Sequence, residues 1–398
     1  MKIKDKIYNG LTYLSAIIGC LVLLSILVYV FGKGFSTLSI DMLKDDYWSK
    51  NYLVQIEENN EAGNYSYDQD IPFSSKWGIA FSDGVTSQKE KVITVEYIDP
   101  SSPLNSLLNM TSGAQYLSKV ELHPGSMIEK IEYVDSNGTI KLAGKIMKMD
   151  AQTLADTLDE AQSINSIYFK TTGGGIRGSL IATLYLILIS LALALPLGIA
   201  AAIYLQEYAK KNLVNRLIRQ GIETLTGVPS IVYGLMGVTV LFPITTIFGA
   251  TGTSILLGGL TMAIILLPTI IKSVEEALIV VPQSLQDASL SLGATKAQTI
   301  LKVVLPCCIN GILTGVLLSI GRVIGESAAF IYTMGTFISD NPTINGSATS
   351  LSLMIWSFMS SEQPNFELAC AISIIILAIV LVLNIIVKII GKKLDRSY

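Results

Sequence analysis

Two charged residues stand inside an otherwise uncharged stretch of the chain. Arg322 and Glu326 lie in the run Gly-Arg-Val-Ile-Gly-Glu-Ser at positions 321–327. A charge at membrane depth is costly unless it faces a partner or a cavity. The i, i+4 spacing puts both side chains on one helix face, where they can pair, and a guanidinium can also bind an oxyanion through two parallel hydrogen bonds. The residues leave two interpretations open: a structural ion pair, or a gate in which a passing anion replaces the carboxylate.

Three further residues belong to the same hypothesis. Gly321 and Gly325 also lie four residues apart, which permits close approach of a second helix and would suit a subunit interface that lines a pore. Arg177 precedes the uncharged run 178–206, where it fits either an interfacial anchor or the outer mouth of a pathway. We include Arg177 with Arg322 and Glu326 as candidate substrate-pathway residues.

The other residue types exclude several kinds of chemistry. The only histidine is His123, and all four cysteines lie in apolar runs, so neither a zinc cluster nor a Ser-His-Asp triad is expected. No Gly-x-x-x-x-Gly-Lys-Ser/Thr motif occurs, and the chain therefore has no P-loop for ATP. We expect no catalytic residue, no metal, no cofactor and no nucleic-acid partner.

The composition is that of a polytopic membrane protein. Of the 398 residues, 51% are hydrophobic and only 15% are charged, and the mean hydropathy is +0.54. Uncharged runs long enough for a span of about 20 residues predict six transmembrane helices. They are 11–31, 178–206, two spans between Glu223 and Lys272 that divide near 242–254, 307–331 and 368–387.

Basic residues predict the orientation of these spans. Of the 28 Lys and Arg residues, 12 lie in the polar segment 32–175, and 14 of the other 16 fall at the N-terminus, in 210–219, in 272–302 and in the tail. These four segments lie on the same side if there are six spans. By the positive-inside rule, that side is cytoplasmic. We expect a multi-pass protein of the bacterial plasma membrane with both termini in the cytoplasm.

The long polar segment has the pattern of a folded domain outside the membrane. Residues 32–175 contain 12 Lys, no Arg and 20 Asp plus Glu. Alternating and β-branched residues predict strands, for example at 91–98, and the apolar spacing over 151–161 predicts a helix. The expected organisation is an N-terminal transmembrane helix at 1–33, an extracytoplasmic α+β insertion at 34–172 and a membrane domain at 173–398.

Residues 282–306 read as two short helices joined by a turn. Pro282 suits the start of the first helix, and Gly293 suits a left-handed C-terminal cap. Thr295 can cap the second helix, which Pro306 is expected to break. Ala288 and Ser289 give the first helix a narrow, smooth face that suits another protein's groove.

The spacing of this segment resembles the "EAA" coupling loop of bacterial ABC-importer permeases. The matching pattern is Asp287-Ala288-Ser289, three residues, Gly293, nine residues, then Val303-x-Leu305-Pro306. Asp287 stands for the usual Glu, Ser289 for the second Ala and Val303 for the usual Ile. The resemblance implies that Asp287, Ala288, Ser289, Gly293, Leu305 and Pro306 couple the chain to a cytoplasmic ATPase.

The order of elements in the polar segment resembles a PDZ domain. Gly78-Ile79-Ala80-Phe81 would be its carboxylate-binding loop, and residues 99–104 would follow its second strand. Ser126 stands where such domains usually carry Asp, and 104–119 is a longer insertion. The resemblance implies a possible peptide ligand, and the alternative is an unrelated α+β insertion that supports the transporter.

Three runs give a closer resemblance, to PstA-type phosphate permeases of ABC importers. They are 196–205 (Pro-Leu-Gly-Ile-Ala-Ala-Ala-Ile-Tyr-Leu), 222–234 (Ile-Glu-Thr-Leu-Thr-Gly-Val-Pro-Ser-Ile-Val-Tyr-Gly) and 325–328 (Gly-Glu-Ser-Ala). The resemblance covers roughly 170–390 and implies a MetI-like transmembrane fold. It also implies a second homologous permease subunit as heterodimer partner, a cytoplasmic ATPase dimer and an extracytoplasmic phosphate-binding protein. In such permeases, the Arg and Glu matched by Arg322 and Glu326 are implicated in phosphate passage.

The expected function is therefore the membrane subunit of an ATP-driven phosphate importer. A permease for another oxyanion, such as sulfate or molybdate, is the alternative, because no residue set here physically excludes those anions. An intramembrane protease would need a zinc or Ser/His motif, which a single histidine does not supply. A secondary transporter would predict inverted repeats, which the sequence does not show.

Overall fold

The chain folds into two compact units in the computed structural model, which describes residues 2–57, 62–85, 91–111, 116–171, 173–210, 212–360 and 364–394. One unit is helical and comprises Met1–Lys44 and Ile176–Tyr398, and the other comprises Asp45–Gly175. The sequence assigned residues 34–44 to the insertion. They group instead with the helical unit, because η1 (Phe35–Thr37) packs on α15 (Phe366–Leu394) and α2 (Asp41–Lys44) packs on α4 (Arg177–Ile203).

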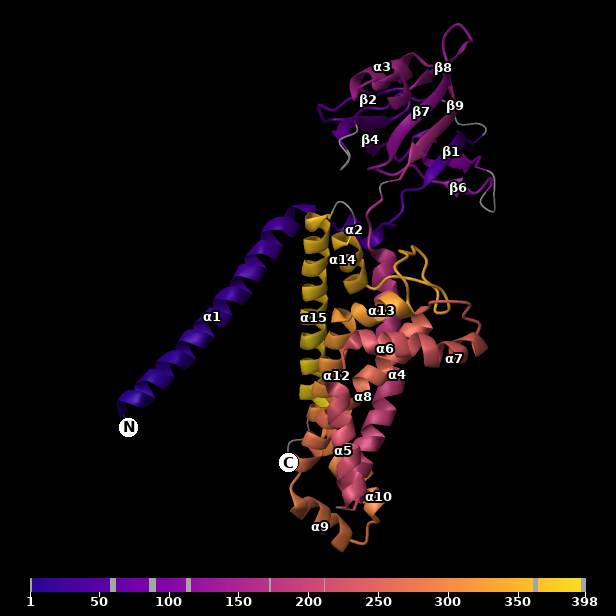
Figure 1. Cartoon of the computed structure of the whole chain (residues 1–398). Helices are drawn as coiled ribbons and strands as arrows, with labels where there is room; N and C mark the ends of the chain where they lie inside the picture. The colour runs from indigo at the N-terminus through magenta and orange to yellow at the C-terminus, as the bar shows by residue number, and fades with distance from the viewer. Residues whose placement is uncertain are drawn as a thin grey trace. The chain divides into compact units, whose positions relative to one another are not determined.

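Three long helices form the centre of the helical unit. α4 and α8 (Ile255–Val280) lie side by side, and α12 (Ile309–Gly325) packs on the other part of α8 (Figure 1). Close contact depends on glycine: a Cβ on Gly198 would lie 2.6 Å from Ile270, and one on Gly311 would lie 2.2 Å from the Ala277 Cβ. The remaining elements are α1 (Lys2–Gly34), η4 (Tyr204–Tyr208), α5 (Leu213–Thr226), α6 (Ser230–Met236), η5 (Gly237–Leu241), α7 (Phe242–Ile247), α9 (Gln283–Ser291), α10 (Lys296–Thr299), η6 (Ile300–Val304), α11 (Leu305–Cys307), α13 (Ala328–Thr333) and α14 (Leu351–Met359).

Five helices in the described part of the chain are long and apolar enough to cross a membrane. They are Tyr8–Thr37, Arg177–Tyr208, Ser230–Ile247, Ile255–Val280 and Phe366–Lys393. A sixth is reached only if Lys296–Cys307 and Ile309–Gly325, which are bent by 66°, count as one span. Six spans therefore stay a prediction. The first of these helices, α1, contacts α15 through Gly34 and has no buried residue in its most apolar window.

The third span begins later than the sequence predicted. Glu223, expected near the start of this span, lies in the separate helix α5, which is amphipathic and has no buried residue. The helical structure is interrupted after α5 at Gly227, Val228 and Pro229, and Pro229 is the N-cap of α6. Because Pro lacks the N–H that a continuing helix needs, the break falls just before it. Glu223 is then near a helix C-terminus, where Lys272 pairs with it at 3.6 Å.

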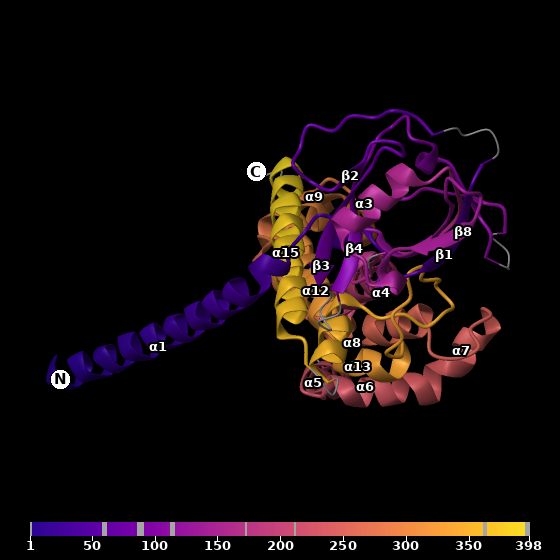
Figure 2. The same cartoon turned by 90° about the horizontal axis from the view of Figure 1, so that it is seen from above.

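The second unit is one antiparallel sheet with a covering helix. The strands follow the order β2-β3-β4-β7-β9-β1-β5-β6, with β8 paired to β7, and the sheet is strongly curved (Figure 2). The strand pairs among the described residues are antiparallel. The elements are β1 (Asn51–Ile56), β2 (Phe73–Ser74), β3 (Ile79–Val85), β4 (Lys91–Ile98), η2 (Pro103–Asn105), β5 (Leu107–Asn109), β6 (Lys119–Val120), β7 (Met127–Val134), β8 (Ile140–Ala143), η3 (Lys145–Met147), α3 (Ala151–Glu160) and β9 (Ser163–Lys170).

The local patterns in this unit predicted its main elements. β4 occupies the predicted strand, and α3 fills all but the last residue of the predicted helix. Leu154 and Leu158 of α3 are fully buried against sheet residues such as Phe81. The alternation of apolar residues thus places the core between α3 and the concave side of the sheet.

The loop expected to bind a peptide carboxylate is engaged within the unit. The backbone N–H of Gly78 donates to Ser74 O at 2.9 Å, and that of Phe81 donates to Pro72 O at 2.8 Å. β2 pairs with the start of β3 and packs against α3. Beside this loop, the Asp159 carboxylate accepts the backbone N–H groups of two residues that precede Gly78, Ser75 and Lys76. A peptide ligand stays a prediction that these contacts do not favour.

The chain enters and leaves the second unit through two adjacent segments. The backbone N–H of Gly174 donates to Tyr47 O at 2.8 Å, and that of Gly175 donates to Asp46 O at 3.1 Å. Within the helical unit, the next residue, Ile176, donates to Met42 O at 2.8 Å. The incoming and outgoing segments therefore form a short antiparallel pair.

Candidate coupling loop and anion pathway

Arg322 lies midway along the bundle and is held by a neighbouring helix. Its Nη1 donates to Thr269 Oγ1 of α8 at 3.4 Å. No carboxylate oxygen lies within 4.0 Å of its guanidinium in the described residues. Thr269 is near the middle of α8. The guanidinium is half-buried and keeps donors available for an oxyanion.

The spacing predicted that Glu326 lies on the same helix face as Arg322, but the structure does not place it there. α12 ends at Gly325, and Glu326 has extended backbone angles of φ −78° and ψ 129°. Its Oε1 accepts the backbone N–H of Ala329 at 3.3 Å, and its backbone carbonyl accepts the Ser352 hydroxyl. The residue therefore stabilises the start of α13 at a break in the helix. The prediction of one fifth span over 307–331 was wrong in its end point, because this break ends the helix at Gly325.

Another broken helix packs against α13. α6 begins after the break at Pro229, and its Gly234 faces α13 so closely that a Cβ would lie 2.7 Å from Ala329 O. On α12, by contrast, no described atom outside the helix's own backbone lies within 4 Å of a Cβ built on Gly321 or Gly325. The face of α12 that carries these glycines is open in this chain.

Arg177 lies far from Arg322 along the bundle. It is the first residue of α4, whereas Gly198 of the same helix contacts Ile270, the residue after Thr269. The 21 residues from Arg177 to Gly198 correspond to roughly 30 Å of helix. The structure does not bring the third pathway candidate together with the other two, and Arg177 can act only at a separate point.

The segment 282–306 forms the predicted pair of capped helices. Gly293 has φ +88°, a left-handed conformation that disfavours a side chain, and it follows α9 as expected. Thr295 caps α10, where its side chain accepts the N–H of Gln298 and the Gln298 side chain accepts the N–H of Thr295. The turn geometry is thus fixed by local hydrogen bonds.

The two coupling residues next to Asp287 lie differently from each other. Asp287 and Ala288 are exposed, but Ser289 is half-buried and its hydroxyl lies 2.9 Å from that of Thr299. Ser289 therefore joins α9 to α10 and is not part of a smooth outer face. Beyond it, Leu292 is 90% exposed, which leaves a large apolar side chain for a partner to cover.

The end of this segment bends later than expected. Pro306 does not end the second helix. The π-helical turn η6 precedes it, Pro306 lies inside α11, and the 66° bend falls between Cys307 and Ile309. A π-turn shifts the hydrogen-bond pattern by one residue, which accommodates the N–H that proline lacks. Leu305 and Pro306 therefore lie in the last helical turn before the bend that leads into α12.

A comparison with known proteins identifies the permease part of the chain. Residues 194–398 match the family of the binding-protein-dependent transport system inner membrane component, which is just over half of the chain. The chain belongs to this family. It is a permease subunit of an ABC transporter, an integral inner membrane protein and not an enzyme.

Individual relatives agree with the family. "Probable ABC transporter permease protein YqgI" of Bacillus subtilis (strain 168) is 33% identical over 240 residues, which cover 56% of this chain and 80% of that protein. "Phosphate transport system permease protein PstA 1" of Mycobacterium tuberculosis (strain CDC 1551 / Oshkosh) is 32% identical over 225 residues, or 56% of this chain and 72% of that protein. A solved chain of the inward-facing MetNI methionine ABC transporter covers 56% of this chain and 96% of its own length, at 18% identity and a TM-score of 0.44.

In this permease, Arg219 and Lys296 from two of the basic segments form a junction at the end of α4. Arg219 of α5 donates to Glu275 Oε1 of α8 at 2.6 Å and to the carbonyl of Leu205 at 2.6 Å. Lys296 of α10 donates to the carbonyl of Glu207 and lies over the Tyr208 ring, 4.9 Å from its centroid. The C-terminal end of α4, with η4, is therefore tied to α5, α8 and the coupling helices at once.

The sequence reasoning on this permease missed that junction. The Glu275 side chain is only 14% exposed, although it lies near the end of an apolar helix where charged residues usually face solvent. The signal was present in the apolar periodicity of 213–226, which describes an amphipathic helix with Arg219 on its polar side. The described residues contain no group of three or more His, Cys, Asp or Glu that could hold a metal ion.

Proposed function

We propose that this permease carries inorganic phosphate inward across a bacterial plasma membrane, driven by ATP hydrolysis in a partner. Both termini would be cytoplasmic. The pathway would form between this chain and a second, homologous permease subunit. A cytoplasmic ATPase dimer would contact residues 282–306, and an extracytoplasmic binding protein would deliver phosphate. The names of several relatives, such as phosphate transport system permease protein PstA, support the substrate.

The observation that carries the proposal is the setting of Arg322. Arg322 is half-buried beside the middle of α8, where its guanidinium donates a hydrogen bond to Thr269. A buried guanidinium without a carboxylate is costly, and a phosphate that binds bidentately would offset that cost during passage. The open α12 face at Gly321 and Gly325 gives the second permease a place to complete the pathway.

Glu326 and Arg177 have different parts in this proposal. Glu326 would keep the break between α12 and α13 open at the level of the pathway, through its hydrogen bond to Ala329. Arg177 would attract the anion at the outer end of α4, far from Arg322. A cation at such a mouth raises the local anion concentration without forming a binding site of its own.

The coupling step uses the exposed part of α9. Asp287, Ala288 and Leu292 are exposed, whereas Ser289 joins α9 to α10 through Thr299, and Leu305 and Pro306 lie in α11 just before α12. Closure of the ATPase dimer would push α9 and, through the rigid turn at Gly293, move α12 with it. The junction of Lys296 with Glu207 would carry the same movement to α4.

The decisive experiment is uptake of labelled phosphate by the assembled transporter in reconstituted vesicles. Wild type should take up phosphate only with internal ATPase activity, and Arg322→Gln should lower uptake strongly while the ATPase stays bound. Arg322→Lys tests the bidentate contact, and Lys392→Gln, an exposed charge on α15, is the matched control. Sulfate and molybdate are offered as competitors. Full phosphate uptake by Arg322→Gln, or preferential uptake of another oxyanion, would sink the phosphate proposal.

Coupling is tested separately by changes in α9 and its cap. Asp287→Ala and Gly293→Val should abolish uptake while the chain still inserts and reaches normal levels in the membrane. Ser284→Ala, also exposed on α9, is the control and should leave uptake unchanged. Normal uptake by both Asp287→Ala and Gly293→Val would show that the loop does not transmit the movement.

A further inference from the structure

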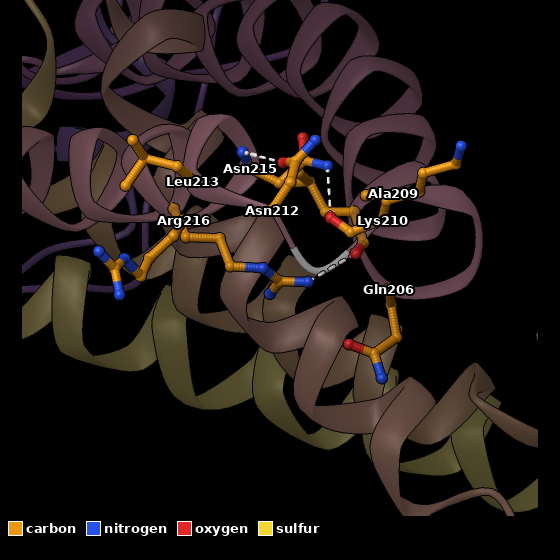
Figure 3. A pocket seen from close by; sticks show the side chains of 9 residues that line it. Gln206, Ala209, Lys210, Asn212, Leu213, Asn215 and Arg216 are labelled. Atoms are coloured by element: carbon orange, nitrogen blue, oxygen red, sulfur yellow. Dashed lines mark hydrogen bonds between the residues drawn. The ribbon is translucent and has the colours of Figure 1, made fainter.

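A basic cavity opens beside the C-terminal end of α4. It has a volume of about 460 Å³ and lies between η4, the following loop and the first turns of α5 (Figure 3). Nine residues line it, of which three are basic, Lys210, Arg216 and Arg219, and none is acidic. Two asparagines make its rigid wall, since Asn212 caps α5 and the Asn215 side chain donates to Lys210 O at 2.8 Å.

Two of the three cations lack a compensating charge. Arg219 is already bonded to Glu275 and to Leu205 O. Lys210 and Arg216 are exposed and make no ion pair within the part of the chain that the structure describes. Both residues line the cavity, and in Figure 3 their side chains extend in opposite directions, toward its two ends. The cavity is therefore an anion site by charge.

The surroundings of the cavity are apolar, which an ordinary cytosolic anion site would not need. Leu213 is 61% exposed and lines the cavity, and Leu217, one turn further along α5, is 55% exposed. Tyr208 of η4 is 48% exposed on the other side. Amphipathic helices with basic and large apolar residues lie at the surface of membranes, where tyrosine is also enriched.

The position of the cavity agrees with a membrane surface. Lys296 of α10 reaches the carbonyl of Glu207, next to the lining residue Gln206, so the cavity lies at the same end of the helical unit as α9 and α10 (Figure 1). Basic pockets between helices at the cytoplasmic side of a membrane bind the head groups of anionic lipids.

We infer that this cavity binds a phosphate group, which the positive charges of Lys210 and Arg216 on its lining attract. The group can belong to an anionic phospholipid of the inner leaflet or to inorganic phosphate from the cytosol. The apolar border at Leu213 and Leu217 fits the acyl chains of the lipid. Because Arg219 of the same cavity holds α5 to α8, a bound phosphate group would also brace the junction that connects α4 with the coupling helices.

The inference is tested by native mass spectrometry of the full-length chain in a neutral detergent. The protein is titrated with phosphatidylglycerol, with phosphatidylcholine of the same acyl chains, and with inorganic phosphate. Two double variants are compared: Lys210→Gln with Arg216→Gln in the cavity, and Lys388→Gln with Lys392→Gln, two exposed charges on α15. Since each basic residue near an anionic surface contributes about fivefold to binding, the cavity variant should lower affinity roughly thirtyfold.

The three titrations separate the two sources of phosphate. Preferential binding of phosphatidylglycerol that only the cavity variant loses supports a lipid, and the same loss for inorganic phosphate supports a soluble ligand. Equal binding of both lipids together with no phosphate binding overturns the inference, as does an equal loss in both double variants. Size-exclusion chromatography checks folding, and Arg216→Gln alone replaces the double variant if that does not fold.

Discussion

The carboxylate of Glu326 lies 3.3 Å from the backbone nitrogen of Ala329, three residues further along the chain. This contact gives Glu326 a role at the helix break that does not require an ion pair with Arg322. In the proposed pathway the two residues would have separate parts: a guanidinium that can contact an anion, and a carboxylate that fixes the path of the backbone next to it.

Replacing Glu326 should distinguish these roles. Glu326→Gln keeps an oxygen that can accept the Ala329 N–H, so phosphate uptake should stay near that of wild type. Glu326→Ala removes it, which costs roughly 1 kcal/mol at a helix N-terminus, and uptake should fall. The measurement is initial uptake rate in vesicles at equal protein. A loss of uptake by Glu326→Gln as large as that by Glu326→Ala would show that the negative charge itself is needed.

The contact between α8 and α12 predicts a strong effect of small substitutions. A Cβ on Gly311 would lie 2.2 Å from the Ala277 Cβ, so Gly311→Ala should destabilise the chain by about 1–3 kcal/mol, the usual range for overpacking. Gly321→Ala on the same helix is the matched control, because nothing lies within 4 Å of that position. Thermal unfolding of each variant in detergent measures the difference. Equal melting temperatures for the two variants would contradict the close packing.

The Arg219–Glu275 pair should contribute to stability. The Glu275 side chain is 14% exposed and that of Arg219 is 39% exposed, so Arg219→Ala leaves a largely covered carboxylate unpaired. We expect a loss of about 1–3 kcal/mol, between the values for exposed and buried pairs.

A double-mutant cycle isolates this interaction. Arg219→Gln and Glu275→Gln are compared singly and together by thermal unfolding, and the double variant should be more stable than the sum of the single losses predicts. Additive losses would show that the 2.6 Å contact contributes nothing of its own.

The second unit should lose stability in acid partly through Asp150. The Thr153 side chain and backbone N–H stabilise its carboxylate, which lowers the pKa of Asp150 below its usual value. A lowered pKa contributes stability at pH values above the unfolded pKa of about 3.9. That contribution is lost as the pH falls through the folded pKa. Asp150→Ala should therefore be less stable than wild type near neutral pH, and the gap should close in acid.

Trp77 provides a local probe for this measurement. It is buried and donates to Leu158 O of α3 at 3.0 Å, so its fluorescence reports whether the helix stays packed. With Trp48 and Trp356 replaced by Phe, thermal unfolding is followed at neutral pH and at about pH 3, below the usual Asp pKa. A constant difference between wild type and Asp150→Ala across this range would contradict the prediction.

Short-range signals in the sequence predicted the local geometry of the coupling segment. The left-handed turn at Gly293 and the capping box at Thr295 depend on a few neighbouring residues, and the structure has both. β4 follows in the same way from alternation over eight residues. Such features are readable because backbone strain and capping hydrogen bonds act within one or two turns.

Features that depend on tertiary packing could not be predicted in this way. Apart from Glu326, uncharged residues continue beyond Gly325, so nothing in the local sequence indicated that α12 ends there. The break is stabilised by the hydrogen bonds of Glu326 with Ala329 and Ser352. Arg219 and Glu275 are 56 residues apart, so their contact follows from the packing of α5 on α8. The EAA-like spacing predicted a loop for a partner, but only the structure separates the exposed Asp287 from the internally bonded Ser289.

The paired segments at Tyr47 and Gly174 predict that the sheet unit can be deleted from the chain without disturbing the helical unit. Because the incoming and outgoing strands lie side by side, and Met42 O already accepts the N–H of Ile176, the two cut ends left by excising Asp45–Gly175 start close together. A few glycines would then rejoin Lys44 to Ile176 without stretching the helices. Closing so short a gap costs little chain entropy, so the shortened permease should insert and fold as the full chain does.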